Sequence, residues 1–392
     1  MKKISLSIAF LMIGVIAFAQ QALFGGSQLV SPEIHPDNTV TFRLLAPKAV
    51  KVQITGDFLP KAKMQTERGL IDIPGTTDLV EKENGVWEYT TPEPLPSELY
   101  SYSFIVDGFK TNDPSNVFLN RDVKSITNIF IIGGNPGHLY KVNKVPHGTV
   151  ARRWYNSPGL GMERRLTNYT PAGYENSGKR YPVLYLLHGA GGDEEAWIAL
   201  GRTAQIMDNL IAQGKAKPMI VVMTNGNAGQ EAAPGESSYD QQPSMNQPGN
   251  IPGKFEAAFP DVVNFIDKNY RTIKQKSGRA ISGLSMGGGH TINISMDFPD
   301  MFDYIGVFSS TLFRQGNDYS EAIEKLKVQF AKKPKLYWIA IGKDDFLYKS
   351  CTEFRQRLDE NNLKYTYFEN GEGHIWKNWR IYLSMFAPQL FQ

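Results

Sequence analysis

The sequence predicts an α/β domain with a largely parallel sheet, preceded by a smaller all-β sandwich. In the first third of the chain, hydrophobic residues alternate with polar ones, whereas later hydrophobic runs are continuous and are separated by helical stripes. Alternation with a period of two is typical of strands with one buried face, and continuous apolar runs are typical of parallel strands buried on both faces. A segment rich in Gly and Pro at residues 133–137 separates the two patterns and marks a domain boundary.

The all-β region is predicted to span residues 25–133. Val40, Phe42 and Leu44 alternate with polar neighbours, and a second alternating run at residues 100–106 ends at Asp107-Gly108, a hairpin-type turn. Short alternating strands punctuated by Gly, Pro and Asn predict a β-sandwich of about 100 residues.

The α/β domain is predicted to span residues 141–392. Its apolar runs at residues 183–187, 219–223 and 336–341 are interpreted as buried strands, and the stripe at residues 262–270 as a helix. Cys351, Phe354 and Leu358 share a second helical stripe, so we expect the cysteine to be a small core residue. Residues 228–254 are rich in Gly, Pro, Gln and Ser without a period, which favours a segment that is mobile or functional.

Composition and charge exclude several classes of protein. The chain of 392 residues has 41% hydrophobic and 21% charged residues, which excludes bulk disorder. Its net charge of +3 argues against nucleic-acid binding, and its single cysteine excludes an internal disulfide and any site with several cysteine ligands. A basic start, an apolar run and Ala17-Phe18-Ala19 predict a signal peptide at residues 1–19, so we expect a secreted or periplasmic protein without membrane insertion in its mature form.

Gly283-Leu284-Ser285-Met286-Gly287 follows a short strand pattern and precedes a helical stretch. This is the context of a nucleophile elbow, in which a tight turn lifts the serine above the sheet. The positions two before and two after the serine must lack bulk, which glycine provides, and the helix N-terminus faces the reacting oxygen. Ser285 is therefore the predicted nucleophile, with a purely structural turn as the alternative.

The segment His188-Gly189-Ala190-Gly191-Gly192, here named the HGAGG loop, directly follows the strand predicted at residues 183–187. In α/β-hydrolases such a loop supplies part of the oxyanion hole. We expect the backbone N–H groups of Ala190 and Met286 to bind the oxyanion. His188 itself is expected to order the loop rather than to act as a base.

An acid and a base complete the predicted triad. A serine needs a base to accept its proton, and the base needs a carboxylate to fix its tautomer and stabilise its cation. Asp345 ends the turn after residues 336–341, and His374 lies in a later Gly-rich loop, so the chain order Ser285, Asp345, His374 matches that of α/β-hydrolases. His290 is the competing base and Asp344 the competing acid.

Four motifs resemble bacterial feruloyl esterases of carbohydrate esterase family 1, which are esterase D-like α/β-hydrolases. They are residues 283–290 (GLSMGGGH), 186–192 (LLHGAGG), 225–227 (NGN) and 371–376 (GEGHIW), and the resemblance extends from about residue 148 onward. It implies that Ser285 is the nucleophile, that His374 is the base and that the acid lies in a Gly-x-x-Asp turn, which supports Asp345. The N-terminal region is similar in strand pattern to early-set immunoglobulin-like modules related to family-48 carbohydrate-binding modules, either as a glycan binder or as a spacer.

The resemblance implies a function. The expected enzyme releases ferulate or related hydroxycinnamates from feruloylated arabinoxylan or xylo-oligosaccharides through an acyl-enzyme, with no metal or organic cofactor. Removal of acetyl groups from xylan is the alternative reaction, and a non-catalytic glycan-binding protein on a hydrolase scaffold is the alternative outside enzymes. Candidates for holding the phenolic ring, each with a core position as the alternative, are Trp197, Trp376 and Trp379.

Overall fold

The computed structural model describes residues 29–66, 69–239, 241–247, 249–313 and 318–392. The chain forms two compact units. The first contains the described residues up to Pro96 together with Tyr100–Leu119 and Thr127–Phe130, and the second contains Ser97–Leu99, Asn120–Ile126 and Ile131–Gln392. The signal peptide predicted at residues 1–19 lies outside the described residues.

The first unit is a sandwich of two sheets, as the alternating pattern predicts. One sheet has the strand order β1-β2-β8-β7, and the other has the order β11-β12-β9-β3-β6 with β10 paired to β9. Aromatic rings of the two sheets meet in the core, where Phe42 of β2 lies 4.8 Å from Tyr102 of β9 and 5.4 Å from Phe130 of β12, between ring centroids. The strands are β1 (Glu33–Ile34), β2 (Val40–Leu45), β3 (Val52–Gly56), β6 (Gly75–Asp78), β7 (Val80–Glu81), β8 (Val86–Thr90), β9 (Leu99–Val106), β10 (Phe109–Thr111), β11 (Leu119–Asp122) and β12 (Ser125–Ile131), with a separate hairpin of β4 (Ala62–Thr66) and β5 (Gly69–Ile73) and a short turn of helix η1 (Glu83–Gly85).

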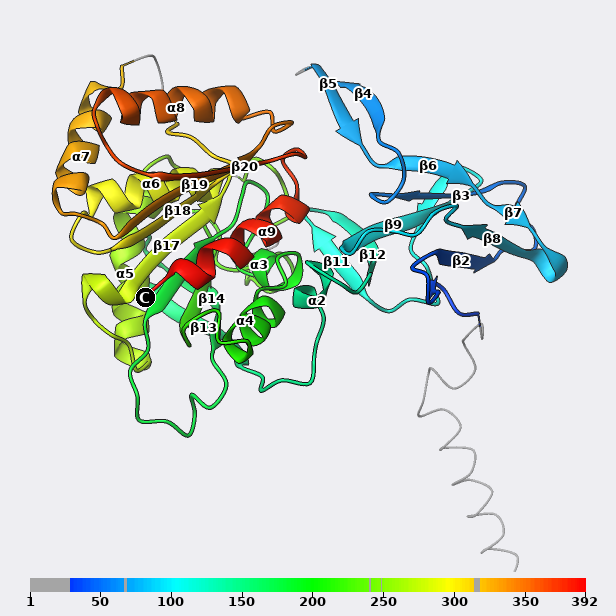
Figure 1. The fold of residues 1–392 in the computed structure, drawn as a ribbon, viewed down its shortest axis with the longest axis horizontal. Helices are drawn as coiled ribbons and strands as arrows, with labels where there is room; N and C mark the ends of the chain where they lie inside the picture. Colours follow the sequence, from blue (N-terminus) through cyan, green and yellow to red (C-terminus); the bar gives the residue numbers. More distant parts are fainter. Residues whose placement is uncertain (1–28, 67–68, 240, 248, 314–317) are drawn as a thin grey trace, which may run out of the picture. The chain divides into compact units, whose positions relative to one another are not determined.

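The second unit is built on one eight-stranded sheet with the order β13-β14-β16-β15-β17-β18-β19-β20 (Figure 1). The pairs β13–β14 and β14–β16 are antiparallel, and the other neighbours are parallel. The apolar runs predicted as buried strands are all strands of this sheet. The strands are β13 (Thr149–Ser157), β14 (Met162–Thr170), β15 (Val183–Leu187), β16 (Ile220–Thr224), β17 (Arg279–Leu284), β18 (Tyr304–Phe308), β19 (Leu336–Gly342) and β20 (Thr366–Asn370).

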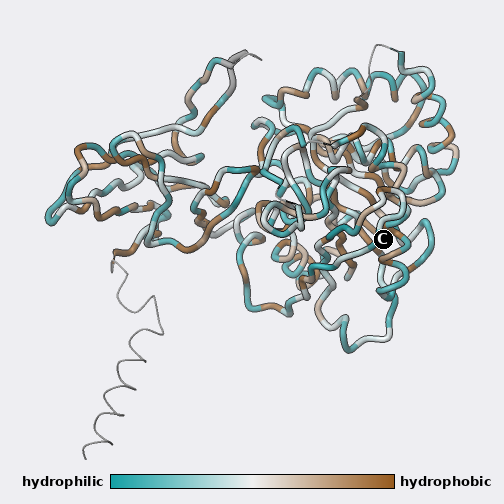
Figure 2. Tube along the Cα trace, turned by 180° about the vertical axis from the view of Figure 1, so that it is seen from behind, coloured by the Kyte–Doolittle hydropathy of each residue, from teal (hydrophilic) through white to brown (hydrophobic). Residues whose placement is uncertain are grey.

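Helices cover both faces of this sheet. Side chains of α5, α6, α7 and α8 form one large core cluster with one face of the strands. On the other face, Phe308 and Trp338 pack against Tyr382 and Phe386 of α9. Figure 2 shows hydrophobic residues along the inner strands. The helices are α2 (Gly137–Tyr140), α3 (Ala196–Ala199), α4 (Thr203–Ala212), α5 (Lys254–Asn269), α6 (Met286–Asp297), α7 (Ser320–Ala331), α8 (Tyr348–Glu360) and α9 (Trp376–Phe386), with short turns η2 (Lys276–Gly278) and η3 (Ala387–Gln389).

The parallel strands determine where the chemistry can gather. Because β17, β18, β19 and β20 are neighbours and run in one direction, the segments that follow them emerge at the same edge of the sheet. Ser285 follows β17, Asp345 follows β19 and His374 follows β20. In the part of the chain that the structure describes, no helix has the length and hydrophobicity needed to cross a bilayer.

Candidate active site

Ser285 stands at a sharp junction between β17 and α6. Its φ of 53° and ψ of −118° lie outside the usual regions for a residue with a side chain, which is a strain that local packing must maintain. The Ser285 N–H donates to the Phe308 carbonyl (2.9 Å), and Ser310 Oγ donates to the Ser285 carbonyl (2.6 Å). Both bonds use the serine backbone and come from β18 and the residues after it, so they hold the turn without engaging the side-chain hydroxyl.

The glycines around Ser285 are required by close packing. A Cβ on Gly283 would overlap the Gly287 carbonyl, and a Cβ on Gly287 would lie 2.5 Å from the carbonyl oxygens of Leu187 and His188. Any larger residue would therefore push the elbow away from the end of β15. This is the steric requirement that the sequence pattern indicates for a nucleophile elbow.

The structure pairs His374 with Asp345. His374 Nδ1 lies 3.0 Å from Asp345 Oδ1 and 2.9 Å from Oδ2, and the Asp345 side chain is completely buried. Asp345 also accepts the Leu347 N–H at 2.9 Å, which fixes its orientation. With Nδ1 bonded to the carboxylate, Nε2 is the atom that is able to accept a proton. Asp344, the competing acid, is exposed to solvent.

The HGAGG loop lies against the elbow. A Cβ placed on Gly189 would be 3.3 Å from Ser285 Cβ and 2.5 Å from Leu284 Cδ1, so a larger residue would require Leu284 to shift. Met286 is the first residue of α6, and the first N–H groups of a helix have no partner within the helix. The two expected oxyanion donors, Ala190 and Met286, therefore lie on segments that flank Ser285, and both residues are partly exposed.

His188 orders the HGAGG loop. Its ring is buried, Nδ1 lies 2.7 Å from the Gly189 carbonyl, and Nε2 lies 2.8 Å from the Gly226 N–H, which donates to it. This arrangement needs a neutral ring with its proton on Nδ1, because Nε2 must accept. Burial lowers the pKa of His188 to about 4, which keeps the ring neutral. His188 therefore has no free nitrogen for proton transfer.

Stability should fall in mild acid because of His188. Its pKa is about 4 in the folded protein against 6.5 for an ordinary histidine, so the unfolded chain binds the proton first. The His188 contribution is complete above pH 6.5 and is lost as the pH falls towards 4, on the order of 3 kcal/mol in total. Urea unfolding of wild type and His188→Gln at pH 7, 5.5 and 4.5 should show a smaller pH dependence in the variant. The exposed His138 provides the control, and equal slopes in wild type, His138→Gln and His188→Gln would contradict the prediction.

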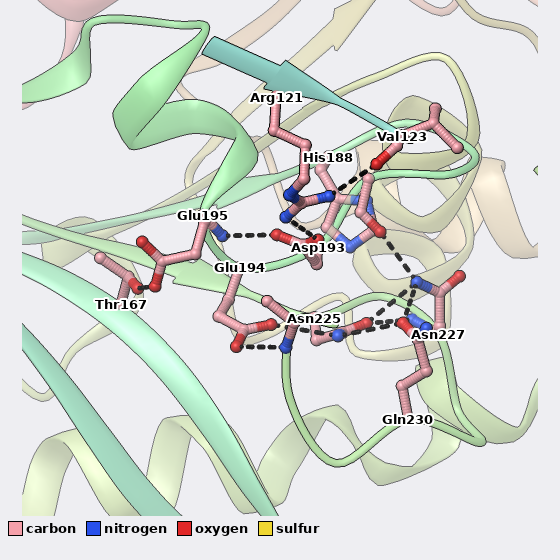
Figure 3. Close-up of polar contacts among 12 residues, drawn as sticks. Arg121, Val123, Thr167, His188, Asp193, Glu194, Glu195, Asn225, Asn227 and Gln230 are labelled. Carbon is pink, nitrogen blue, oxygen red and sulfur yellow. Dashed lines mark hydrogen bonds and ion pairs between the residues drawn. The ribbon is translucent and has the colours of Figure 1, made fainter. Parts of the chain in front are cut away.

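Three consecutive acidic residues follow the HGAGG loop, and an arginine binds each of them. Figure 3 shows the first of these pairs, Arg121 with Asp193. Glu194 is fully buried and also accepts the Ala233 N–H, so it ties the loop to residues 228–254. Burial raises the pKa of Glu194, and the repulsion of Asp193 adds to this, while Arg165 and the Ala233 N–H favour its charged form. The ion pairs are Asp193–Arg121 (2.6 Å), Glu194–Arg165 (2.8 Å) and Glu195–Arg152 (2.8 Å).

Arg164, beside Arg165 on β14, is buried as well. Its guanidinium donates to the carbonyls of Gln230 (3.0 Å), Asn225 (2.7 Å) and Asn227 (2.8 Å). The asparagines of the NGN motif thus form a compact turn beside the HGAGG loop, where Asn227 Nδ2 donates to the Gly192 carbonyl at 3.0 Å. The NGN motif, one of the four that carry the family resemblance, therefore gives structural support to the site.

His290, the competing base, has a different partner. Its Nδ1 lies 2.8 Å from Glu256 Oε1 on α5, and its ring packs against Phe255 with centroids 4.9 Å apart. Burial opposes ionisation of Glu256, but the hydrogen bond and electrostatic attraction of His290, together with further hydrogen bonds, outweigh it, so the pKa of Glu256 lies below its usual value. His290 is thus part of the contact between α5 and α6. Its hydrogen bond to Glu256 is separate from the Asp345–His374 pair.

The three candidate tryptophans differ in exposure. Trp197 is 1% exposed and its Nε1 donates to the Leu187 carbonyl at 2.9 Å, so it supports the site from the core and offers no ring surface to a ligand. Trp379 is also buried and packs edge-on against His374 at 5.0 Å, between ring centroids. Trp376, which contacts Trp197 at 5.3 Å, is partly exposed and is the one of the three with surface for a substrate.

Phe346, which sequence reasoning missed, lies beside His374. Its ring lies 4.5 Å from the His374 ring, between centroids, and 69% of the residue is exposed. An exposed aromatic residue beside the base is suited to contact a flat acyl group. The sequence offers one signal that could have identified Phe346, which is its position directly after Asp345.

Cys351 is buried, and burial raises the pKa of its thiol to about 12, in accord with the expected core position. Among the described residues, no group of three or more His, Cys, Asp or Glu side chains is arranged to hold a metal ion.

A comparison with known families identifies the family of this chain. Residues 157–385, more than half of the chain, match the model of the Esterase family ("Putative esterase"). The chain belongs to the Esterase family. Among curated relatives of this esterase, an endo-1,4-β-xylanase/feruloyl esterase of Xylanibacter ruminicola is 32% identical over 285 residues, which cover 71% of the chain and 36% of the relative. An esterase of Mycobacterium tuberculosis is 32% identical over 143 residues, which cover 35% of the chain and 27% of that relative. The chain thus spans about a third of the length of these relatives.

Solved structures confirm the fold of this esterase. A ferulic acid esterase is 26% identical with a TM-score of 0.51, covering 62% of this chain and 97% of that chain. The enterobactin esterase of Shigella flexneri, 15% identical, has a TM-score of 0.60 and covers 90% of this chain and 93% of that chain, which shows likeness of fold alone. The predicted fold class, an α/β-hydrolase domain preceded by a small all-β sandwich, is therefore correct.

Proposed function

We propose that this esterase is a serine carboxylic-ester hydrolase that releases ferulate or related hydroxycinnamates from feruloylated arabinoxylan or xylo-oligosaccharides. The observation that carries the proposal is the buried Asp345–His374 pair at the sheet edge where Ser285 occupies a strained elbow. The named activity of the Xylanibacter ruminicola relative and the likeness to a ferulic acid esterase support the acyl group. The signal peptide predicted at residues 1–19 supports export to the periplasm or the medium.

The proposed mechanism has two steps. Ser285 Oγ attacks the ester carbonyl while His374 Nε2 takes its proton, and Asp345 stabilises the resulting imidazolium. The N–H groups of Ala190 and Met286 bind the tetrahedral oxyanion, and His374 then gives its proton to the departing sugar oxygen as the C–O bond breaks, which releases the sugar hydroxyl. In the second step His374 deprotonates a water molecule that attacks the acyl-enzyme, and ferulate leaves as Ser285 recovers its proton.

The aromatic surface near the base supports a hydroxycinnamoyl substrate. Phe346 is exposed beside His374, and Trp376 begins the helix that follows the base. A planar phenolic ring gains dispersion and stacking contacts from such side chains, whereas an acetyl group is too small to use them.

A substrate profile tests the proposal. We expect kcat/KM for methyl ferulate and a feruloylated arabino-xylo-oligosaccharide to exceed that for acetylated xylan by about tenfold or more, since aromatic contacts favour one transition state over the other. Phe346→Ala should reduce this preference, and Phe313→Ala, which replaces another exposed phenylalanine, is the matched control. A higher rate on acetylated xylan would favour the acetyl xylan esterase, and no hydrolysis of any ester would favour a glycan-binding protein.

A further inference from the structure

The segment Asn120–Ile126, here named the hairpin tip, joins β11 to β12 and belongs to the second unit. Figure 3 shows its residues Arg121 and Val123 beside the HGAGG loop and Asp193. Arg121 Nη2 donates to Asp193 Oδ2 at 2.6 Å, and Nη1 of the same guanidinium donates to the Val123 carbonyl at 2.9 Å. One side chain therefore fixes the turn of the hairpin tip and joins it to Asp193, the residue that directly follows the HGAGG loop.

Val123 contacts the HGAGG loop directly. Its methyl carbons lie 2.8 and 3.3 Å from the place that a Cβ on Gly191 would occupy, and Gly191 has a φ of +75°. Val123 itself has a φ of +53°, which a β-branched residue adopts only when its surroundings enforce it. The bond from Arg121 to the Val123 carbonyl is such a constraint, so the valine is held against the glycine that follows Ala190.

Asp193 depends on this partner. Only 3% of its side chain is exposed, against 31% for Arg121, and among the described residues Arg121 is the cation that pairs with it. The other carboxylate oxygen of Asp193 accepts the Glu195 N–H at 3.0 Å. A buried carboxylate that loses its cation is strongly disfavoured, so Asp193 would turn towards water and draw the loop with it.

The opposite side of the HGAGG loop is fixed independently. The Gly226 N–H binds His188 Nε2 at 2.8 Å, and Asn227 Nδ2 binds the Gly192 carbonyl at 3.0 Å. The loop is thus held between the NGN turn on one side and the hairpin tip on the other. Removing the contact with the hairpin tip should leave the HGAGG loop in place, because the NGN turn still holds His188 and Gly192. Ala190, which lies between these two residues, should then be free to shift.

We propose that Arg121 is a positioning residue that sets the Ala190 N–H for the oxyanion through Asp193 and Gly191. The inference rests on the proposed serine hydrolase function. Loss of one oxyanion donor typically lowers kcat by about 10²–10³-fold, and a small displacement of a donor has a part of that effect. We therefore expect Arg121→Met to lower kcat about 10- to 100-fold with KM changed less than about threefold.

The experiment compares Arg121→Met with Arg121→Lys and a matched control. Lysine restores the charge but not two separately directed donors, so it should recover part of kcat. Arg152→Met is the control, because Arg152 also binds an acid of the same triplet, Glu195, at 2.8 Å, but not the hairpin tip. The substrates are methyl ferulate and 4-nitrophenyl acetate, and both should be affected alike because the oxyanion is common to all esters.

A second readout separates positioning from general damage. Phenylboronic acid forms a tetrahedral adduct with a nucleophilic serine, so its inhibition constant should rise in Arg121→Met by the factor by which kcat falls, whereas inhibition by ferulate should stay the same. If Arg121→Met lowers the melting temperature, the double variant Arg121→Met/Asp193→Asn serves in its place. It removes the unpaired negative charge of Asp193, which should preserve the fold. Its kcat should still be reduced.

Two results would overturn the inference about Arg121 without contradicting the proposed function. One is a kcat of Arg121→Met close to wild type, or equal to that of Arg152→Met, in an enzyme that Ser285→Ala inactivates. The other is a loss confined to methyl ferulate, which would make Arg121 a substrate contact. If Ser285→Ala retains the activity, the proposed function fails as well, and the inference fails with it.

Discussion

Ser285→Ala should lower kcat on methyl ferulate about 10⁴-fold or more, because without the hydroxyl no acyl-enzyme forms and the hydrogen bonds of the site alone give limited catalysis. The fold should be unaffected. The elbow is held through the backbone of residue 285, by the Phe308 carbonyl and by Ser310 Oγ, and alanine keeps both bonds. Circular dichroism and thermal melting check the fold, and initial rates check the activity.

Ser310→Ala is the matched control for this variant. It removes the hydroxyl that binds the Ser285 carbonyl at 2.6 Å but leaves the nucleophile in place, so its kcat should stay within about tenfold of wild type. A fluorophosphonate should label wild type and Ser310→Ala but not Ser285→Ala. Retention of the activity within tenfold in Ser285→Ala would show that the nucleophile is elsewhere.

The second large effect is expected for Asp345→Asn. Asn keeps the volume of the side chain, but its amide can donate to His374 Nδ1 and thereby place the proton on Nε2, where the serine proton must be accepted. We expect kcat to fall about 10³–10⁴-fold, as is typical when the acid of such a triad is neutralised. Rates on methyl ferulate measured from pH 5 to 9 give the comparison with wild type.

Asp344→Asn is the neighbouring control. Asp344 is exposed and should tolerate the change with a loss of less than about threefold. The two variants lose the same negative charge at adjacent positions. A difference in kcat between them therefore reports the specific role of the side chain and not the change in net charge. Equal, small losses in both would mean that a different carboxylate serves His374.

Steric rules made the elbow predictable. The spacing of Gly283, Ser285 and Gly287 follows from contacts within a few residues, and the continuous apolar runs follow from burial of both strand faces. The strand β14 was not predicted, because it carries Arg164 and Arg165 in the sheet interior. These charges are compatible with burial only through carbonyls and carboxylates far along the chain, which no local pattern reveals.

The same distinction applies to the site. The pairing of His374 with Asp345 could be predicted, because chain order and turn chemistry restrict the choice. The burial of Trp197 could not, because an indole after the HGAGG loop fits a pocket wall and a core position equally well until the packing around it is known. The contact of Arg121 with Asp193 could not be predicted either, because it joins positions 72 residues apart.

Arg164 and Arg165 have a consequence for the evolution of this chain. Successive side chains of a strand point to opposite sides, and these two arginines bind different segments, the turn at residues 225–230 and the acids Glu194 and Glu195. A slip of β14 by a single residue would exchange the two and release both segments together. Insertions and deletions should therefore be rare in β14 and far commoner in surface loops such as residues 175–180, even though β13 and β14 together form an outlying edge of the sheet.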